Sequence, residues 1–315
     1  MNWNDIKRSF RLQFPPEDPA DAGATLGSRP FEELPNRLPI VTITVLLISG
    51  VFFYFTHISP PSEGPLSPDP GYTLGFRDDF HIIMRDWWGI FTNNFFHGSF
   101  LHIIMNSMML ISLGSVMEKG LGSFKTLLIY LAIGGVALSW QLLANNTPLL
   151  LYSEAELIPK TMGRENGVIT HYYGDPPFGG ALGLSGIVFG VIGLMFGAWK
   201  RWTCFLCVFN PRLLKFVAFW QILCFLITWT YAFHQQMSIA NTAHIAGFLF
   251  GFMIGKWMCH GIKDAKLWYG LSLGMLLVAC GSIIFFSFHF GAIYEPVMGI
   301  YDELDIFKAP PSLPF

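Results

Sequence analysis

Uncharged, mainly apolar segments recur seven times along the chain and determine its architecture. Each is close to the roughly 20 residues that a helix needs to cross the hydrocarbon core of a bilayer. Their apolar residues are continuous and lack the period-2 alternation of membrane barrel strands, and an open sheet cannot satisfy its edges in lipid. The pattern predicts an all-α, polytopic bundle of seven transmembrane helices, at about residues 40–56, 100–117, 126–144, 178–198, 216–233, 239–255 and 267–293.

The lysines and arginines between these segments are distributed unevenly, and this distribution predicts the orientation. Basic residues are favoured in the cytoplasmic loops of membrane proteins. With a cytoplasmic N-terminus, fourteen of the 19 lysines and arginines fall on the inner side and five on the outer side. The five outer ones are Arg77, Arg85, Lys160, Arg164 and Lys308. We therefore expect the N-terminus inside and the C-terminus outside.

Composition and charge indicate lipid as the main solvent of the chain. Of the 315 residues, 52% are hydrophobic and only 13% are charged, whereas a soluble domain carries about 25% charged residues. The net charge of -2 provides no basic surface for nucleic acid. The five cysteines lie in or beside apolar segments, so we expect no disulfide framework, and Cys204 and Cys207 lack the second pair of a zinc site.

The polar connections divide the chain into parts. Residues 58–99 are rich in proline, glycine and aromatic residues, which suits a segment lying partly in the membrane interface. Residues 145–177 are more polar and predict an exposed loop or cap. We expect a cytoplasmic N-terminal arm at 1–38, a six-helix core with both long outer loops at 39–258, a cytoplasmic connection and seventh helix at 259–293, and an outer tail at 294–315.

Polar side chains inside three of the predicted spans are the candidates for function, because a polar group in lipid needs a partner. His102 and Asn106 are four residues apart and share one helical face. Ser185 lies in the fourth span and His244 in the sixth. With the N-terminus inside, these helices all run inward, and at about 1.5 Å per residue the four side chains lie within roughly 10 Å of the outer boundary.

Small residues predict that the fourth and sixth helices pack closely. Stripes with a small residue at every third or fourth position let helix backbones approach each other in lipid. The two stripes are Gly186, Gly190, Gly193 and Gly197 in the fourth span, and Ala243, Gly247, Gly251 and Gly255 in the sixth. Close packing would bring Ser185 within hydrogen-bonding reach of His244, and a serine with a histidine base is the minimum arrangement for acyl transfer.

Each of these residues also has a structural interpretation. A lone serine in a membrane helix usually bonds the carbonyl four residues earlier, and His102 and Asn106 can link helices by hydrogen bonds. A metal or proton conduit lined by His97, His102 and His244 lacks the intramembrane carboxylates that hard cations and proton relays use. The common depth of the polar groups favours catalysis instead.

These residues resemble the motifs of the rhomboid family of intramembrane serine proteases. The resemblance covers about residues 40–258 and implies a rhomboid-like six-helix core plus one C-terminal helix, a 6+1 arrangement. The matching motifs are His97-Gly98, His102-xxx-Asn106, Glu118-Lys119 followed by Gly122-Ser123, Gly183-Leu184-Ser185-Gly186 and Ala243-His244-Ile245-Ala246-Gly247.

The resemblance also implies a role for each matching residue. Ser185 is expected to be the nucleophile and His244 the general base, in a dyad without a third acid. His102 and Asn106, with the backbone N–H of Ser185, are expected to hold the oxyanion. His97 would order water and the outer end of the second span, and Gly183 would give the backbone room beside the scissile peptide. No cofactor and no metal are implied.

Two positions depart from the family pattern. The family commonly has Trp-Arg in the first outer loop, whereas this chain has Trp88-Gly89, so an arginine is missing there. The aromatic residue that stacks under the catalytic histidine is often tyrosine, and here it is Phe189. Neither change removes a group that attacks the substrate or accepts a proton.

The expected function is an intramembrane serine endopeptidase that hydrolyses peptide bonds in or near the transmembrane helices of membrane proteins. The alternative is a catalytically silent rhomboid-like protein that binds membrane clients. Such proteins typically lack the serine or the histidine, and this chain has both Ser185 and His244. The expected partners are transmembrane protein substrates and membrane lipid, and the expected location is a bacterial inner (plasma) membrane.

The predicted orientation can be tested with reporter domains fused at Phe315 and within residues 200–215. The two should report opposite sides of the membrane, because the charge distribution places the first outside and the second inside. A third fusion within residues 145–177 should agree with Phe315. Reporters at Phe315 and 200–215 on one side would contradict the odd number of spans.

Overall fold

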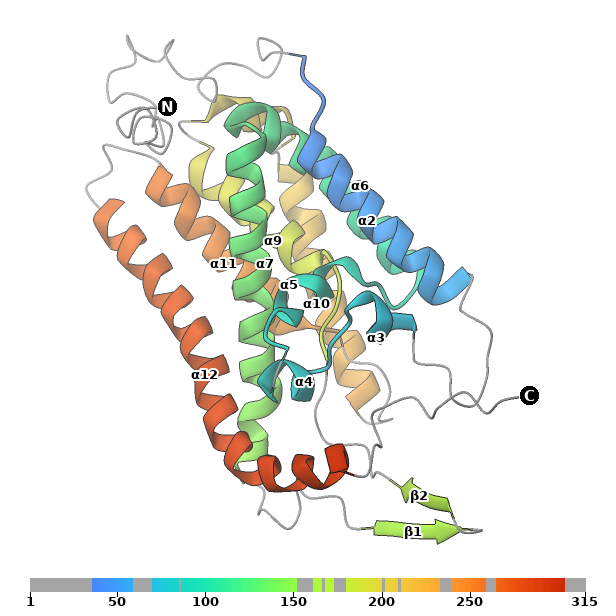
Figure 1. The fold of residues 1–315 in the computed structure, drawn as a ribbon. Coiled ribbons are helices and arrows are strands. Elements are labelled where there is room, and N and C mark those ends of the chain that lie inside the picture. Colours follow the sequence, from blue (N-terminus) through green and yellow to red (C-terminus); the bar gives the residue numbers. More distant parts are fainter. Residues whose placement is uncertain are drawn as a thin grey trace, which may run out of the picture.

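The computed structural model is a bundle of long helices, with several short helices packed beside them in the lower half of Figure 1. It describes residues 36–58, 70–84, 86–151, 161–165, 168–172, 180–199, 202–208, 211–232, 239–258 and 265–303. The expected N-terminal arm, apart from residues 36–38, lies outside the described residues, and so does the end of the expected outer tail, residues 304–315.

The long helices of the described residues coincide with the apolar segments of the sequence. They are α2 (Ile40–Phe53), α6 (Phe100–Leu121), α7 (Ser123–Asn146), α9 (Ser185–Ala198), α10 (Pro211–Ala232), α11 (Asn241–Met258) and α12 (Ala265–Glu303). The shorter elements are a π-helical turn (Tyr54–Ile58), α3 (Pro70–Leu74), α4 (Asp79–Met84), α5 (Gly89–Thr92) and 3-10 turns at Asn93–Phe95, Thr147–Leu151 and Thr203–Cys207. The predicted all-α bundle is confirmed.

Not every one of these helices is long enough to cross a bilayer. Within the described residues, five are long and apolar enough: Ile40–Ile58, Phe100–Leu121, Ser123–Asn146, Arg212–Trp229 and Lys266–Ala292. Helix α9 has only 14 residues, which at about 1.5 Å per residue is roughly 21 Å, shorter than a hydrocarbon core of about 30 Å. Nearly all of its side chains are buried, so it forms the interior of the bundle. The 6+1 count stays a prediction.

A small β-hairpin lies in the connection between α7 and α9. Strands β1 (Thr161–Glu165) and β2 (Val168–Tyr172) pair antiparallel, with Thr161 opposite Tyr172. The second strand is rich in β-branched and aromatic residues, which favour extended backbone. The hairpin lies apart from the long helices of the bundle in Figure 1.

Helices α9 and α11 are in direct backbone contact, as the two stripes of small residues predict. A Cβ atom added to Gly247 would overlap the carbonyl oxygen of Gly186, and one added to Gly251 would overlap that of Gly190. In the opposite direction, a Cβ atom on Gly193 would overlap the carbonyl oxygen of Phe248. No side chain separates the two helices at these points, so their separation and register are determined by the glycines.

A buried carboxylate joins α2, α6 and α7 at the opposite end of α6 from His102. Glu118 accepts hydrogen bonds from the backbone N–H groups of Val41 and Thr42, both at 2.9 Å, and from the hydroxyls of Thr42 at 2.9 Å and Ser123 at 2.7 Å. The first turn of α2 thus receives acceptors for its free N–H groups. Gly122 allows the sharp turn between α6 and α7, because its φ of 88° is unfavourable for other residues.

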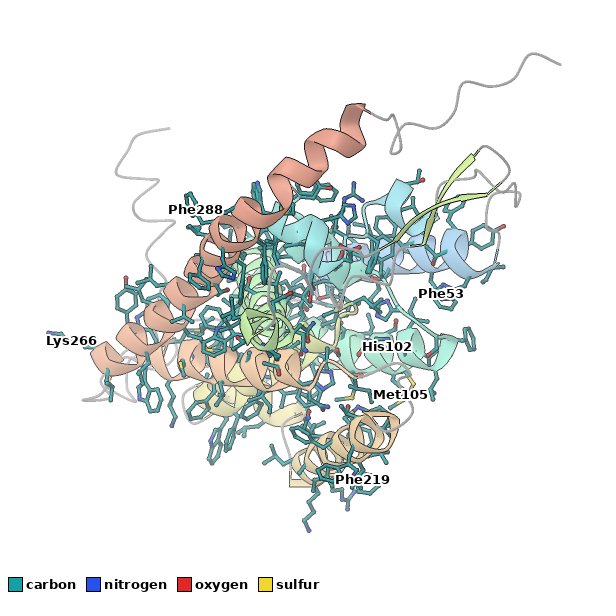
Figure 2. All side chains as sticks on the ribbon, turned by 90° about the horizontal axis from the view of Figure 1, so that it is seen from below. Phe53, His102, Met105, Phe219, Lys266 and Phe288 are labelled. Carbon is teal, nitrogen blue, oxygen red and sulfur yellow. The ribbon has the colours of Figure 1, made fainter. Side chains whose placement is uncertain are left out.

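Helices α10 and α12 expose large apolar side chains on the outside of the bundle. Phe219, Leu226 and Trp229 of α10 are exposed, as is Phe288 of α12. Figure 2 shows Phe219 and Phe288 at the periphery of the structure. An apolar outer surface is expected where lipid replaces water as the solvent.

The backbone contact predicts that Gly251→Ala destabilises the fold. The added methyl group would collide with the carbonyl oxygen of Gly190 and force α9 and α11 apart, at a cost of about 1–3 kcal/mol. Gly274→Ala is the matched control, because nothing lies within 4 Å of a Cβ atom there. Thermal unfolding in detergent should show a lower midpoint for the first variant only. Equal midpoints would contradict the close contact.

Candidate active site

The segment before α9 positions Ser185 as the first residue of a buried helix. Gly183 has a φ of 110°, a conformation that other residues rarely adopt, and it turns the chain into α9. Its N–H donates to the carbonyl oxygen of Asn93 at 3.0 Å. The side chain of Leu184, the N-cap residue, makes no capping hydrogen bond. The first N–H groups of a helix have no partner within the helix, so those at Ser185 are available as donors.

His97, three residues before α6, contacts the segment that precedes α9. Its Nδ1 atom lies 3.2 Å from the carbonyl oxygen of Phe95, and its Nε2 atom accepts from the N–H of Leu184 at 3.5 Å. Since a carbonyl only accepts, Nδ1 carries the hydrogen and the ring is neutral. The ring centroid lies 4.9 Å from that of His102. His97 thus contacts the backbone immediately before Ser185.

Asn93, which the sequence analysis missed, ties the first outer loop to the same segment. Its side chain accepts from the N–H of Arg77 at 2.9 Å and donates to the carbonyl oxygens of Arg77 and Ala181, the latter at 3.2 Å. Together with the bond from Gly183, this makes Asn93 a buried junction between two loops. It lies outside the apolar segments, so the search for polar residues within spans could not find it.

His102 and Asn106 lie against Gly183. A Cβ atom on Gly183 would be 2.7 Å from Cε1 of His102 and 3.6 Å from Nδ2 of Asn106. Ser99 caps α6 by accepting from the N–H of His102 at 3.2 Å, which fixes the start of the helix. The Nδ2 atom of Asn106 is buried and has no hydrogen-bond partner. An unused buried donor is uncommon and indicates a site for a ligand group.

Ser185 and His244 are brought together by the contact between α9 and α11. Both are buried, with 9% and 3% of their surfaces exposed. The ring of Phe189, one turn after Ser185, stacks on His244 with centroids 4.5 Å apart and an interplanar angle of 7°, which confirms the expected stack. Within the described residues, no hydrogen bond joins Ser185 directly to His244.

Two glutamines in neighbouring helices contact the start of α11, and the sequence analysis missed both. Oε1 of Gln221, in α10, lies 3.1 Å from Nδ1 of His244. Oε1 of Gln141, in α7, accepts from the N–H of Ala243 at 3.0 Å. Both residues are polar groups within predicted spans, so the rule that selected His102 and Asn106 would have found them.

A small cavity of about 40 Å³ adjoins Ser185. It lies between α6, α9 and α10 and is lined by Asn106, Ser185, Phe189 and apolar side chains such as Met105 and Trp220. Figure 2 shows His102 and Met105 on α6, the helix that forms one wall. Ser185 and Asn106 therefore line the same small cavity.

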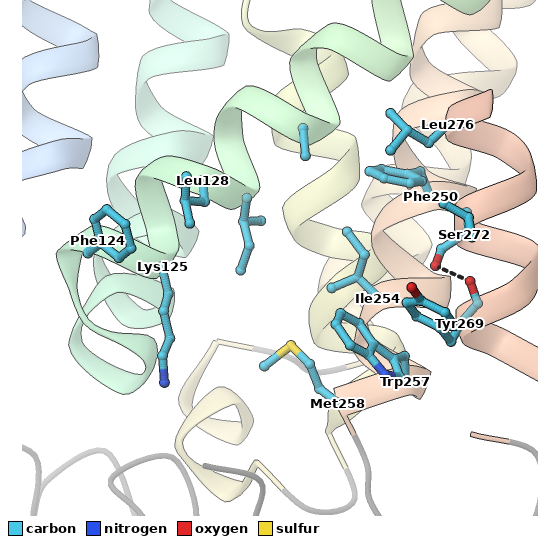
Figure 3. Close-up of a pocket in the computed structure, with 13 residues that line it drawn as sticks. Phe124, Lys125, Leu128, Phe250, Ile254, Trp257, Met258, Tyr269, Ser272 and Leu276 are labelled. Atoms are coloured by element: carbon cyan, nitrogen blue, oxygen red, sulfur yellow. Dashed lines mark hydrogen bonds between the residues drawn. The ribbon is translucent and has the colours of Figure 1, made fainter. Parts of the chain in front are cut away.

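A second cavity, of about 420 Å³, lies away from this site (Figure 3). It is formed by α7, α11 and α12, and its lining includes Lys125, Phe250, Trp257 and Tyr269. None of the residues predicted to act in catalysis lines it. The catalytic candidates therefore lie at the smaller of these two cavities.

Arg77 lies beside Trp88, the residue after which the family's arginine is missing in this chain. Its guanidinium lies 4.5 Å from the ring centroid of Trp88 and pairs with Asp86. A Cβ atom on Gly89 would be 2.8 Å from the Cβ atom of Arg77. The glycine thus leaves room for an arginine that comes from an earlier position in the loop, which sequence order alone did not reveal.

A chain of side chains leads from the outer loop to the start of α11. Asp79, in the first turn of α4, accepts from Nδ2 of Asn145 at 2.8 Å. Oδ1 of Asn145 accepts from Nε2 of Gln141 at 2.8 Å, and Gln141 bonds the N–H of Ala243. Burial raises the pKa of Asp79 to about 7. The carboxyl group therefore titrates near neutral pH at a junction between loop and bundle.

Fold and site define a multi-pass helical membrane protein in which a buried serine and a buried histidine lie on two helices in backbone contact. The family follows from comparison with known proteins. The family model of the rhomboid domain matches residues 84–261, more than half of the chain. The chain belongs to the rhomboid family, as its motifs predict.

The curated relatives are distant. Rhomboid protease GlpG of Pectobacterium atrosepticum is 26% identical over 224 residues, which cover 69% of this chain and 60% of that protein. Rhomboid protease GluP of Bacillus subtilis is 27% identical over 99 residues, 31% and 19% of the two chains. RHOMBOID-like protein 4 of Arabidopsis thaliana is 25% identical over 187 residues, 58% and 37% of the two chains. The match covers less than two thirds of each of these relatives.

The pKa of Asp79 predicts that stability falls as pH rises from about 4 to 7. The folded protein keeps a proton on this carboxyl up to pH about 7, whereas the unfolded chain releases it near 3.8. Each pH unit between these values costs the folded state up to about 1.4 kcal/mol. Thermal unfolding across this range should show the slope in the wild type.

The variant Asp79→Asn should flatten this dependence, because it has no proton to lose. Asp78→Asn, at the neighbouring and partly exposed carboxylate, keeps Asp79 and should keep the slope. A slope that persists unchanged in Asp79→Asn would show that another group causes it.

Proposed function

We propose that this protein is an intramembrane serine endopeptidase, with Ser185 as nucleophile and His244 as general base. The observation that carries the proposal is the placement of both residues, buried, on two helices in backbone contact, with Phe189 linking them through its stack on the histidine. A serine beside a histidine base is the arrangement that acyl transfer requires. The protease names of two relatives agree with it.

The donors around Ser185 suit a developing oxyanion. His102 and the unpaired Nδ2 of Asn106 lie against Gly183, and the backbone N–H of Ser185 is at a helix N-terminus. Donors fixed in a dry site stabilise the tetrahedral intermediate, each by roughly 3 kcal/mol in other serine hydrolases. Gly183 would leave space for the scissile peptide, and His97 would hold the segment that carries these donors.

The proposed reaction follows from these positions. The hydroxyl oxygen of Ser185 attacks the peptide carbonyl while Nε2 of His244 takes its proton, and the carbonyl oxygen moves toward His102 and Asn106. His244 then gives the proton to the leaving amine as the C–N bond breaks. Water, deprotonated by His244, hydrolyses the acyl-enzyme and restores Ser185.

The proposed substrates are transmembrane helices of other membrane proteins. Because a helical peptide keeps its carbonyls in internal hydrogen bonds, a segment loosened by glycine, proline or polar residues reaches Ser185 more readily. We also propose an inward N-terminus, an outward C-terminus and the 6+1 arrangement, with the catalytic core at residues 39–258. The proposed reaction uses only side chains and water.

The proposal predicts that Ser185→Ala and His244→Ala each abolish cleavage of a transmembrane substrate. The double variant should be no worse than either single one, because residues that act as one unit lose their effect together. Cleavage of a panel of helix-destabilised substrates by purified protein measures this, and labelling of Ser185 by a fluorophosphonate probe gives a second readout. Circular dichroism and thermal unfolding should be unchanged.

The same experiment separates the protease from a client-binding protein. A silent family member would keep its binding to membrane clients in all three variants, and its wild type would not label at Ser185. A well-folded wild type that neither labels nor cleaves any substrate of the panel would rule out the proposed activity.

A further inference from the structure

We propose that Gln221 is a positioning residue for His244, whose side-chain carbonyl determines which ring nitrogen carries the hydrogen. This inference rests on the proposed function of Ser185 and His244 and adds a third, uncharged member to the pair. Gln221 comes from α10, a helix that contributes none of the residues identified from sequence motifs. Its consequence is that Nε2 of His244 is free to accept the proton of Ser185.

Two contacts hold the His244 ring. One face stacks on Phe189 with an interplanar angle of 7°, which sets the plane of the ring. At the ring edge, Nδ1 lies 3.1 Å from Oε1 of Gln221, which limits the rotation of the ring. A stack on one face and a hydrogen bond at Nδ1 together leave the ring little freedom, so the direction of Nε2 is determined.

The donor and acceptor in each hydrogen bond of this network can be assigned by starting from backbone carbonyls, which can only accept hydrogen bonds. Nδ2 of Asn241 lies 3.3 Å from the carbonyl oxygen of Ile239, so this side-chain atom must be the nitrogen. The same atom lies 2.7 Å from Oγ1 of Thr228. That hydroxyl donates its single hydrogen to the carbonyl of Cys224 at 3.0 Å, and therefore accepts from Asn241. Two independent carbonyls thus fix the orientation of the Asn241 amide.

The orientation of Asn241 determines that of Gln221. Oδ1 of Asn241 lies 2.8 Å from the Gln221 amide, which must present its Nε2 donor to that oxygen. Oε1 of Gln221 is then the atom that faces His244. An oxygen needs a donor, so Nδ1 of His244 carries the hydrogen, and in a neutral imidazole the other nitrogen is then the acceptor. The backbone carbonyls thus orient the amides of Asn241 and Gln221, and these amides place the hydrogen of His244 on Nδ1. This is the tautomer that a general base acting through Nε2 requires.

Because Gln221 is uncharged, it affects the histidine differently from a carboxylate at the same place. A carboxylate at this place would also stabilise the imidazolium that forms when the histidine takes a proton. An amide oxygen accepts the same hydrogen bond before and after proton transfer, but it adds no opposite charge. Gln221 therefore positions the base rather than strengthening it.

The test uses full-length protein labelled with ¹⁵N-histidine. The ¹⁵N shifts of His244, assigned by their loss in His244→Ala, report which ring nitrogen carries the hydrogen. The wild type should carry it on Nδ1. Gln221→Met removes the acceptor at similar volume, so the tautomers should mix, and labelling of Ser185 by a fluorophosphonate should slow by about 10- to 100-fold.

Gln141→Met is the matched control, because it removes the same side chain from α7, where Gln141 bonds the backbone of α11 rather than the ring. It should leave the hydrogen on Nδ1. Gln221→Glu loses the donor to Oδ1 of Asn241 but keeps an acceptor for Nδ1–H, so it should keep the hydrogen on Nδ1. A hydrogen on Nε2 in this variant would contradict the role of the acceptor, even where Gln221→Met fails to fold.

The outcomes separate this inference from the proposed function. A wild type with the hydrogen on Nε2, or a folded Gln221→Met with unchanged tautomer and labelling rate, would overturn the role of Gln221 while leaving the protease intact. A wild type that never labels at Ser185 but carries the hydrogen on Nδ1 would instead overturn the protease and leave the positioning of the ring standing.

Discussion

The direct backbone contact between α9 and α11 is the constraint on which the rest of the structure depends. Moving an apolar side chain from lipid into a helix interface gains no hydrophobic free energy. Helices in a membrane therefore associate through close packing and polar contacts. Glycines in both helices allow that packing here, with Gly186 against Gly247 and Gly190 against Gly251. The position of Ser185 relative to His244 is therefore a property of two main chains, which are stiffer than any pair of side chains.

Features with a local signature were predictable from the sequence. Long apolar segments, a four-residue period of glycine and rare polar residues in spans each have one physical cause in a membrane. They led to the all-α bundle and to the contact between α9 and α11, which the structure confirms. The same logic selected Ser185 and His244 as catalytic candidates.

Other features depend on partners far apart in the sequence, and these were not predictable. Arg77 occupies the place beside Trp88 because Gly89 leaves space there, which only the folded loop reveals. Asn93 joins two loops whose approach depends on the whole bundle. Gln221 is different, because it is polar within a span and was overlooked among residues with stronger motifs.

The shortness of α9 has a consequence for how a substrate bond would be chosen. A helix of 14 residues is shorter than the hydrocarbon core of a bilayer, and Ser185 is its first residue. Ser185 is thus held at a fixed position along the bundle by the buried helix that it begins. Under the proposed function, the depth of Ser185 selects the peptide bond, so shifting a substrate helix along its own axis would change the bond that is presented even though its sequence stayed the same.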